Sequence, residues 1–278
     1  MKLAIFNPEH DLCLAKGRVH YVPPRSAIVF ARHDASVMQV LYPDAVCYSV
    51  YDLALGKNDR PDMVIAWGWD AVVKHELIKR CVSVDLLPTD EEINTIRELQ
   101  HRSNVLPLQP DCQEVHSVEE MESLLCERKH WVMKAPWSGA GRGLRWVHGI
   151  LTDIDRDWLL KTVAKQRCVI VEPRRDVVAD LALEYMDGLF FGYSYFKTGS
   201  GVYKENIPWS DEQIETGFPV VLEVRKRVEL WLAVNIWPRY RGPLGVDLMV
   251  CRDGSVHVSE INIRHTMGMV AHSKINKQ

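Results

Sequence analysis

Two Asp-Gly dipeptides constrain the second half of the chain more than any other feature. Asp187-Gly188 joins the apolar runs VVADLALEYM and LFFGYSYF, and Asp253-Gly254 joins LGVDLMVC and SVHVSEINI. An Asp-Gly pair between two apolar runs is a strong signal for a β-hairpin. The helix-like stretch PVVLEVRKRVELWLAVNI lies between the two hairpins. We therefore expect residues 174–278 to form an antiparallel sheet with a helical cover.

The first part of the chain has a different pattern, in which short apolar runs alternate with helical stretches. Such runs are typical of buried parallel strands. They are LAIF at 3–6, AIVF at 27–30, VCYSVY at 46–51, MVIAWGW at 63–69 and, after a helix over 70–80, CVSV. The pattern predicts an α/β domain over residues 1–87.

Residues 88–173 combine helical and hairpin signals. Thr89 with Glu92, and Ser117 with Glu120, form capping boxes that open two helices. The strand WVMKAP and its hairpin partner LRWVHG follow, and then the helix DIDRDWLLKTVAKQ and the strand CVIVEP. This order predicts a small α+β domain, so the fold class of the whole chain is α/β and α+β.

The charge and composition of the chain exclude several classes of partner. The 278 residues carry a formal net charge of −3, with a pI near 6.4, so no global attraction to nucleic acid or to a membrane surface is expected. The first ten residues, MKLAIFNPEH, have too few apolar side chains for a signal peptide or a membrane span. The seven cysteines include no CxxC pair and are expected to be reduced. These features predict a cytoplasmic protein with no nucleic-acid or membrane partner.

The stretch WVMKAPWSGAGRGLRW places Lys134 at the end of an apolar strand, before three glycines at alternate positions. Glycines let the backbone approach a ligand closely, and backbone amides together with Lys134 and Arg142 favour an anion. Because the whole chain is slightly acidic, a small phosphorylated ligand is the best candidate. A flexible hairpin tip is the alternative interpretation.

The second hairpin carries three polar side chains on two apolar strands: Asp247, Glu260 and Asn262. Residues two apart on a strand face the same side, so Glu260 and Asn262 should point together while Ile261 and Ile263 pack into the core. If Asp247 lies opposite them, the three side chains offer hard oxygen ligands for one or two Mg²⁺ ions. Solvated carboxylates on a strand face are the alternative.

These motifs occur in an order that resembles the ATP-grasp superfamily. The order is a strand lysine before a glycine loop, an apolar strand ending in Glu172, and then Asp…Glu-x-Asn on a late hairpin. The resemblance covers roughly residues 89 to 272. It implies an N-terminal α/β domain (1–87), a small lid domain (88–173) and a C-terminal sheet domain (174–278), with ATP held between the last two.

The resemblance also implies roles in nucleotide binding. Lys134 would contact the phosphates, and the loop that closes over them would contain Ser138, Gly139, Gly141, Arg142 and Gly143. The backbone of Ile170 and Val171 would pair with the adenine edge, and Glu172 would bind the adenine amino group or polar groups near it. Asp180 lies where the family often places a carboxylate on the ribose hydroxyls, and a solvated strand-end acid is the alternative.

The catalytic residues that the resemblance implies are Lys134, Arg102 and Arg264. Many members carry a lysine where this chain has Arg102, and arginine can hold phosphate by a bidentate fork. A helix-terminal arginine without a ligand is the alternative. Arg264 continues the alternation of the metal ligands and would hold the substrate carboxylate or the acyl phosphate. His265 is expected to be structural and, if the strand continues, to face the opposite side together with Met267.

The reaction that the resemblance implies is ATP-dependent ligation. Mg²⁺, with Mn²⁺ as an alternative, would help to activate a carboxylate as an acyl phosphate for attack by an amine. A kinase and a non-catalytic nucleotide-binding module are the alternatives. Both substrates are small molecules whose identity stays open, as does the oligomeric state, and a homo-oligomer is compatible with the sequence.

Two polar segments of the first domain are candidates for substrate binding. Asn7, Glu9, His10 and Asp11 directly follow the first strand, where open α/β sheets place ligand-binding loops. They either bind substrate or form a polar turn. The segment WGWD at 67–70 either lines a pocket or covers a domain junction.

Overall fold

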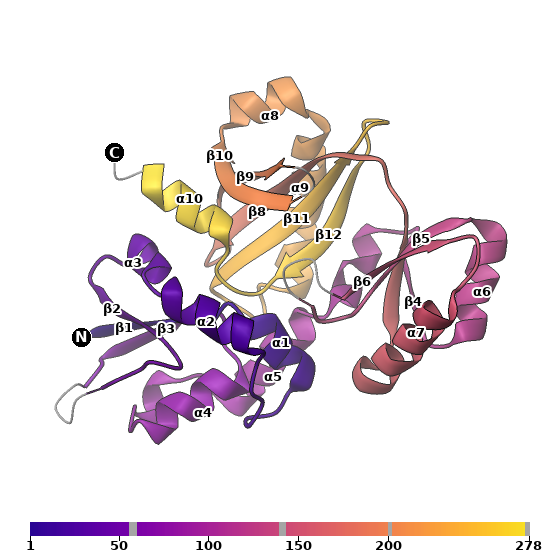
Figure 1. Ribbon diagram of the computed structural model, residues 1–278. Helices are drawn as coiled ribbons and strands as arrows, with labels where there is room; N and C mark the ends of the chain where they lie inside the picture. The colour runs from indigo at the N-terminus through magenta and orange to yellow at the C-terminus, as the bar shows by residue number, and fades with distance from the viewer. Residues whose placement is uncertain (56–59, 139–142, 200–201, 276–278) are drawn as a thin grey trace.

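The computed structural model describes residues 1–55, 60–138, 143–199 and 202–275, and these residues contain three β-sheets (Figure 1). The first sheet is parallel, as expected, with β1 between its two partners. Its strands are β1 (Lys2–Phe6), β2 (Ala45–Ser49) and β3 (Met63–Ala66). The helices of this region are α1 (His10–Lys16), α2 (Arg25–His33), α3 (Val37–Leu41), α4 (Ala71–Lys79) and the 3₁₀ helix η1 (Val84–Leu86).

The prediction of two of the strands is wrong. AIVF lies inside α2, and CVSV turns at Cys81 and reaches η1 at its last residue, Val84. A run of four apolar residues does not distinguish a strand from one turn of helix, and Pro24 directly before α2 favours a helix start. Cys81 has a φ of 58°, and the N–H of Val82 donates to the carbonyl of Leu77. CVSV therefore begins by closing the end of α4.

The second sheet is antiparallel and has the order β4-β7-β5-β6. Its core contains Met121, Met133, Leu159 and Val171, which the two neighbouring helices help to bury. In Figure 1 this sheet and its helices lie to one side of the rest of the chain. The elements are β4 (Gln113–Val115), α6 (Val118–Glu127), β5 (His130–Lys134), β6 (Leu144–His148), α7 (Asp153–Gln166) and β7 (Val169–Pro173).

The third sheet is antiparallel, has the order β10-β9-β8-β11-β12, and contains both expected hairpins. Asp187 and Gly188 have φ values of 53° and 87°, as a two-residue hairpin turn requires. Helix α9 supplies the expected helical cover. The elements are β8 (Val177–Met186), β9 (Leu189–Gly199), β10 (Val202–Trp209), α8 (Asp211–Gly217), α9 (Val220–Asn235), β11 (Pro243–Cys251), β12 (Val256–Asn262) and α10 (Met267–Ile275).

A connecting segment joins the first and second sheets and carries Arg102. It consists of α5 (Asp90–Leu99), which opens with the expected Thr89 to Glu92 capping box, and the 3₁₀ helix η2 (Arg102–Leu108). Leu99 and Val105 pack into the core of the five-stranded sheet. Arg102 is therefore held beside β12, although it lies far from that strand in the sequence. The division of the chain at residues 87 and 173 stays a prediction.

Within the described part of the chain, no helix combines the length and the apolar character needed to cross a membrane.

Candidate active site

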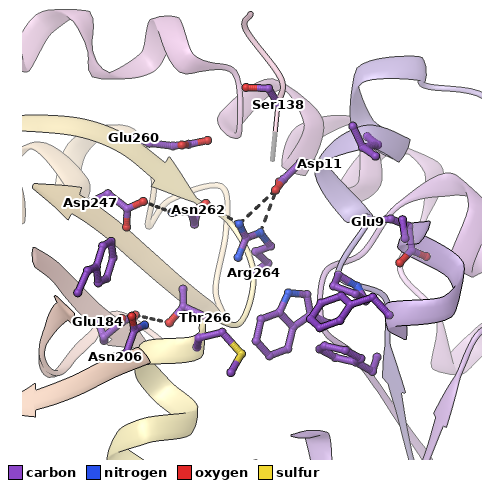
Figure 2. Close-up of a pocket in the computed structure, with 18 of the residues that line it drawn as sticks. Glu9, Asp11, Ser138, Glu184, Asn206, Asp247, Glu260, Asn262, Arg264 and Thr266 are labelled. Atoms are coloured by element: carbon purple, nitrogen blue, oxygen red, sulfur yellow. Dashed lines mark hydrogen bonds and ion pairs between the residues drawn. The ribbon is translucent and has the colours of Figure 1, made fainter. Parts of the chain in front are cut away.

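A cavity of about 620 Å³ lies where the first and third sheets meet (Figure 2). Its walls come from the loop after β1, from α2, from the β11–β12 hairpin and from the start of α10. The residues that matter most for its chemistry are Glu9, Asp11, Asp247, Glu260, Asn262 and Arg264. The cavity therefore joins the polar segment after the first strand to the predicted metal ligands.

The hairpin register brings the three predicted metal ligands onto one face. Asp247 lies directly opposite Glu260, and the side-chain amide of Asn262 donates to Asp247 Oδ2 at 3.2 Å. Ile261 and Ile263 are buried on the other face, in the core of the sheet. Burial, followed by the charge of Glu260, raises the pKa of Asp247 to about 8.

The donor set suits a hard divalent cation in part. Two facing carboxylates that are largely shielded from solvent are stabilised when a cation lies between them. The amide oxygen of Asn262 already accepts from Arg264 Nη2 at 2.9 Å, so ligation by Asn262 requires the other orientation of its amide. Across the described residues, no three Asp, Glu, His or Cys side chains form a cluster that could hold a metal ion. Asp247 and Glu260 are therefore the protein ligands that fit Mg²⁺ best.

Arg102 is buried and bridges three parts of the site. Its Nη2 donates to Glu260 Oε2 at 2.6 Å, and its Nη1 donates to the carbonyl of Ala135 and, at 3.0 Å, to Ser138 Oγ. Its described partners are all protein groups, so the binding of phosphate by Arg102 stays a prediction. Arg102 connects β12 to the segment that leads into the glycine loop.

Lys134, Glu172 and Asp180 form a second charged group. Lys134 Nζ lies 2.6 Å from Glu172 Oε1, and both side chains are buried. Burial raises the pKa of Asp180, and the positive charge of Lys134 opposes that rise. Lys134 and Glu172 belong to the four-stranded sheet and Asp180 to the five-stranded sheet, so the group spans the two.

The backbone of Ile170 and Val171 is less suited to adenine than expected. β7 is an interior strand, and both residues pair with β4 on one side and with β5 on the other. Their peptide groups already belong to the sheet. The described register with β4 ends at Val171, so the backbone at Glu172 is the better candidate for the adenine edge.

Only part of the glycine loop can be compared with the prediction. Gly139, Gly141 and Arg142 lie outside the described residues. Gly143 has a φ of 74°, and a Cβ on it would lie 2.8 Å from the Cβ of Ser138. Ser138 is itself buried and accepts from Arg102. Glycine is therefore required at position 143 by both conformation and space.

Arg264 contacts Asp11 as well as Asn262, a contact that the sequence did not indicate. Its Nη2 lies 3.1 Å from Asp11 Oδ2, and Figure 2 shows the line of contacts from Asp11 through Arg264 and Asn262 to Asp247. Gln100 was also missed. It donates to Asp11 Oδ1 and accepts from the N–H of Ile263. The position of Asp11 directly after the first strand was the available signal.

Asn7 and His10, which also follow β1, make structural contacts with the segment 67–70. Asn7 donates to the carbonyl of Gly68 and to Asp70, and His10 Nδ1 lies 3.3 Å from Asp70 Oδ2. A Cβ on Gly68 would lie 2.6 Å from the His10 ring, which explains the glycine in WGWD. Trp67 takes both roles considered for this segment, because it lines the cavity and packs against the junction with α10.

His265 is structural, as expected, whereas the strand does not continue to Met267, so the condition for its predicted side is not met. His265 Nε2 lies 2.7 Å from the Tyr42 hydroxyl and its Nδ1 lies 3.1 Å from the carbonyl of Trp67. Burial lowers the pKa of His265 to about 4, so the ring is neutral at neutral pH. Met267 lines the cavity because β12 ends at Asn262 and α10 starts at Met267, so the strand alternation does not reach it.

Glu184 and Thr266 are cavity residues that the sequence analysis did not single out. Glu184 is fully buried on β8, and the hydroxyl of Thr266 donates to its Oε2 at 2.6 Å. Burial raises the pKa of Glu184 to about 7. The signal available was a single glutamate in the apolar run LALEYM.

Comparison with known proteins identifies the fold. No protein-family model matches the sequence, and no curated protein matches it. Among solved structures, D-cycloserine synthetase DcsG is 13% identical with a TM-score of 0.59, covering 100% of this chain and 99% of that one. N5-carboxyaminoimidazole synthetase from Staphylococcus aureus, complexed with ADP, is 12% identical with a TM-score of 0.56, covering 96% and 71%. The ATP-grasp ligase PsnB, complexed with a minimal precursor, is 13% identical with a TM-score of 0.51, covering 99% of each chain. The chain therefore has the ATP-grasp fold.

Proposed function

We propose that this chain, which has the ATP-grasp fold, is an ATP- and Mg²⁺-dependent ligase that joins a carboxylate to an amine. The observation that carries the proposal is the position of Arg102. It connects Glu260, a predicted metal ligand, to Ser138 at the entrance of the predicted phosphate loop. The predicted metal and phosphate sites are therefore adjacent, and both border the cavity that contains Arg264.

The nucleotide would lie between the four-stranded and the five-stranded sheets. Lys134 supplies positive charge for the phosphates once its contact with Glu172 rearranges. Asp180 lies close enough to Lys134 for their charges to interact, which suits a role on the ribose. The ADP in the synthetase of similar fold supports an adenine nucleotide as the ligand.

The chain's own residues would position the reacting groups and balance their charge. A substrate carboxylate oxygen attacks the γ-phosphorus of ATP, the bond to ADP breaks, and the amine then displaces phosphate from the acyl carbon. Arg264, which lines the cavity, would hold the oxygens that carry the negative charge in both steps, and Arg102 would join it once its contact with Glu260 rearranges. Mg²⁺ held by Asp247 and Glu260 would neutralise the phosphate oxygens. The amine loses a proton as the C–N bond forms.

The experiment that tests the function measures phosphate release from ATP with a panel of amino acids and dipeptides, followed by mass spectrometry of the products. A ligase gives ADP, phosphate and a product with a new C–N bond. A phosphorylated acceptor without that bond would identify a kinase instead. Binding of Mg·ATP raises the melting temperature of a protein that binds it only when folded, so the absence of any shift would contradict the proposal.

A further inference from the structure

Part of the cavity wall is aromatic, and the proposed reaction gives this part no role. Phe6 packs edge to face against Trp67 and Phe30, with ring centroids 5.1 Å and 5.9 Å apart. Met267 lines the same cavity from α10. Phe6 and Trp67 are buried, whereas Phe30 is 49% exposed. A large aromatic side chain that lines a cavity while half exposed is available to a ligand.

Helix α2 is more apolar than its packing requires. It contains the run AIVF, yet among its described residues Ala31 alone is fully buried. Ala27 and Phe30 line the cavity, three positions apart on one face of the helix. Some of the apolar side chains of α2 therefore face the cavity.

The charges around the cavity favour a cation. The described lining residues include five carboxyl groups against one guanidinium, Arg264, which Asp11 already contacts, while Arg102 contacts Glu260 from outside the lining. If Mg²⁺ takes up Asp247 and Glu260, the carboxyl groups of Glu9, Asp11 and Glu184 remain, and a cation beside Glu9 or Glu184 would favour the ionised form that burial disfavours. Opposite charges attract most strongly where water is excluded. A ligand with an ammonium group therefore fits these acidic residues better than a ligand with a carboxylate.

The side chain of Glu9 gives independent support for a ligand in this cavity, because one of its oxygens lacks a hydrogen-bond donor. It is 4% exposed and lines the cavity near the aromatic wall. Its Oε1 accepts from the hydroxyl of Tyr51 at 2.6 Å, and its Oε2 has no hydrogen-bond donor among the described residues. Buried oxygens without a donor are uncommon in folded proteins, so a ligand that brings N–H groups would satisfy this side chain.

We infer that the amine substrate is a primary amine with a large apolar side group, about the size of a phenyl ring. The apolar group would pack on Phe30, Trp67 and Met267. The ammonium would face the acidic side chains of Glu9, Asp11 and Glu184. The inference rests on the proposed function, because it assigns this cavity to the amine of the ligation. Phe30 is then a residue that determines specificity and does not take part in the chemistry.

The test measures the binding of phenethylamine by isothermal titration calorimetry without nucleotide. Ethylamine has the same ammonium without the ring, and 3-phenylpropionate has the ring with a carboxylate. We expect phenethylamine to bind at least about tenfold more tightly than either, because burial of the ring and attraction of the ammonium each contribute. Equal binding of ethylamine would overturn the apolar subsite, and tighter binding of 3-phenylpropionate would overturn the assignment to the amine.

Matched variants assign the effect to the cavity wall. Phe30→Ala should weaken phenethylamine binding by about tenfold or more, because most of the ring contact is lost. Val29→Ala is the control, since Val29 is also half exposed on α2 but is not among the described residues that line the cavity. Met267→Ala, on a different helix, should act in the same direction as Phe30→Ala. An unchanged affinity in both Phe30→Ala and Met267→Ala, with unchanged melting temperatures, would overturn the inference.

Failure of the inference and failure of the proposed function give different results. A thermal shift with Mg·ATP without a preference for phenethylamine would support the proposed function and contradict the apolar amine substrate. Phenethylamine binding that depends on Phe30, without any response to Mg·ATP, would support the apolar subsite and contradict the ligase function.

Discussion

The guanidinium of Arg102 lies 2.6 Å from the carboxylate of Glu260, which is 158 residues later in the chain. The same guanidinium donates to Ser138 and to the carbonyl of Ala135. In this arrangement Arg102 partly balances a carboxylate that the proposed Mg²⁺ site needs. Metal binding and the Arg102 contact are therefore coupled through Glu260.

Arg102→Ala should make the stability of the protein depend more strongly on Mg²⁺. The variant leaves Glu260 beside Asp247 without its cation, so we expect a loss of about 3 kcal/mol in the free energy of unfolding without metal. Added Mg²⁺ should raise the melting temperature of the variant more than that of the wild type. Differential scanning calorimetry with and without Mg²⁺ measures both quantities.

The control for this prediction is Arg97→Ala. Arg97 lies on α5, donates to the carbonyl of Leu14 and packs over the Trp137 ring. Its loss should lower the melting temperature without changing the response to Mg²⁺. If both variants respond to Mg²⁺ as the wild type does, Glu260 is not coupled to a metal through Arg102.

Lys134→Ala should abolish the thermal shift that Mg·ATP produces. The variant also leaves Glu172 buried without its cation, so part of the effect would come from lost stability. The double variant Lys134→Ala/Glu172→Gln removes that charge and should recover most of the stability while still failing to respond to nucleotide. A normal Mg·ATP shift in the double variant would show that Lys134 does not bind the phosphates.

Glu9→Gln should stabilise the protein at high pH but not at low pH. Burial raises the pKa of Glu9 from 4.5 to about 7, so the folded state holds the proton more tightly than the unfolded state does. As the pH rises from about 4.5 to 7, the unfolded chain loses this proton first, and the free energy of unfolding falls.

The glutamine variant has no proton to lose at this position and keeps the hydrogen bond from Tyr51. Its gain over the wild type should therefore reach up to about 3 kcal/mol at pH 8 and vanish at pH 4. Urea denaturation at the two pH values measures the difference. The same gain at both values would mean that ionisation of Glu9 is not its source.

The sequence predicted those parts of the fold and the site that depend on local signals. The Asp187-Gly188 turn and the alternation at Glu260 and Asn262 follow from turn chemistry and strand period, and the structure contains both hairpins. The apolar run AIVF was misread because a helix that lines a cavity can be as apolar as a buried strand. The contact between Asp11 and Arg264 joins residues 253 positions apart, and no local pattern encodes it. Long-range charge pairs depend on how the sheets pack, which a single sequence does not show.

The last prediction concerns the two faces of β12, where substitutions of neighbouring residues should have different effects. Glu260 faces the cavity and Ile261 is buried in the core behind it. Glu260→Gln keeps the volume of the side chain and removes a charge that the proposed Mg²⁺ site needs, so ATP-dependent phosphate release should be lost while the fold stays intact. Ile261→Ala should instead cost on the order of 2–5 kcal/mol of stability through the cavity it leaves, and the proposed activity should remain at a temperature where the protein is still folded. Phosphate release and urea denaturation, measured on both variants, separate the two effects. Full ATP-dependent activity in Glu260→Gln would remove Glu260 from the catalytic site.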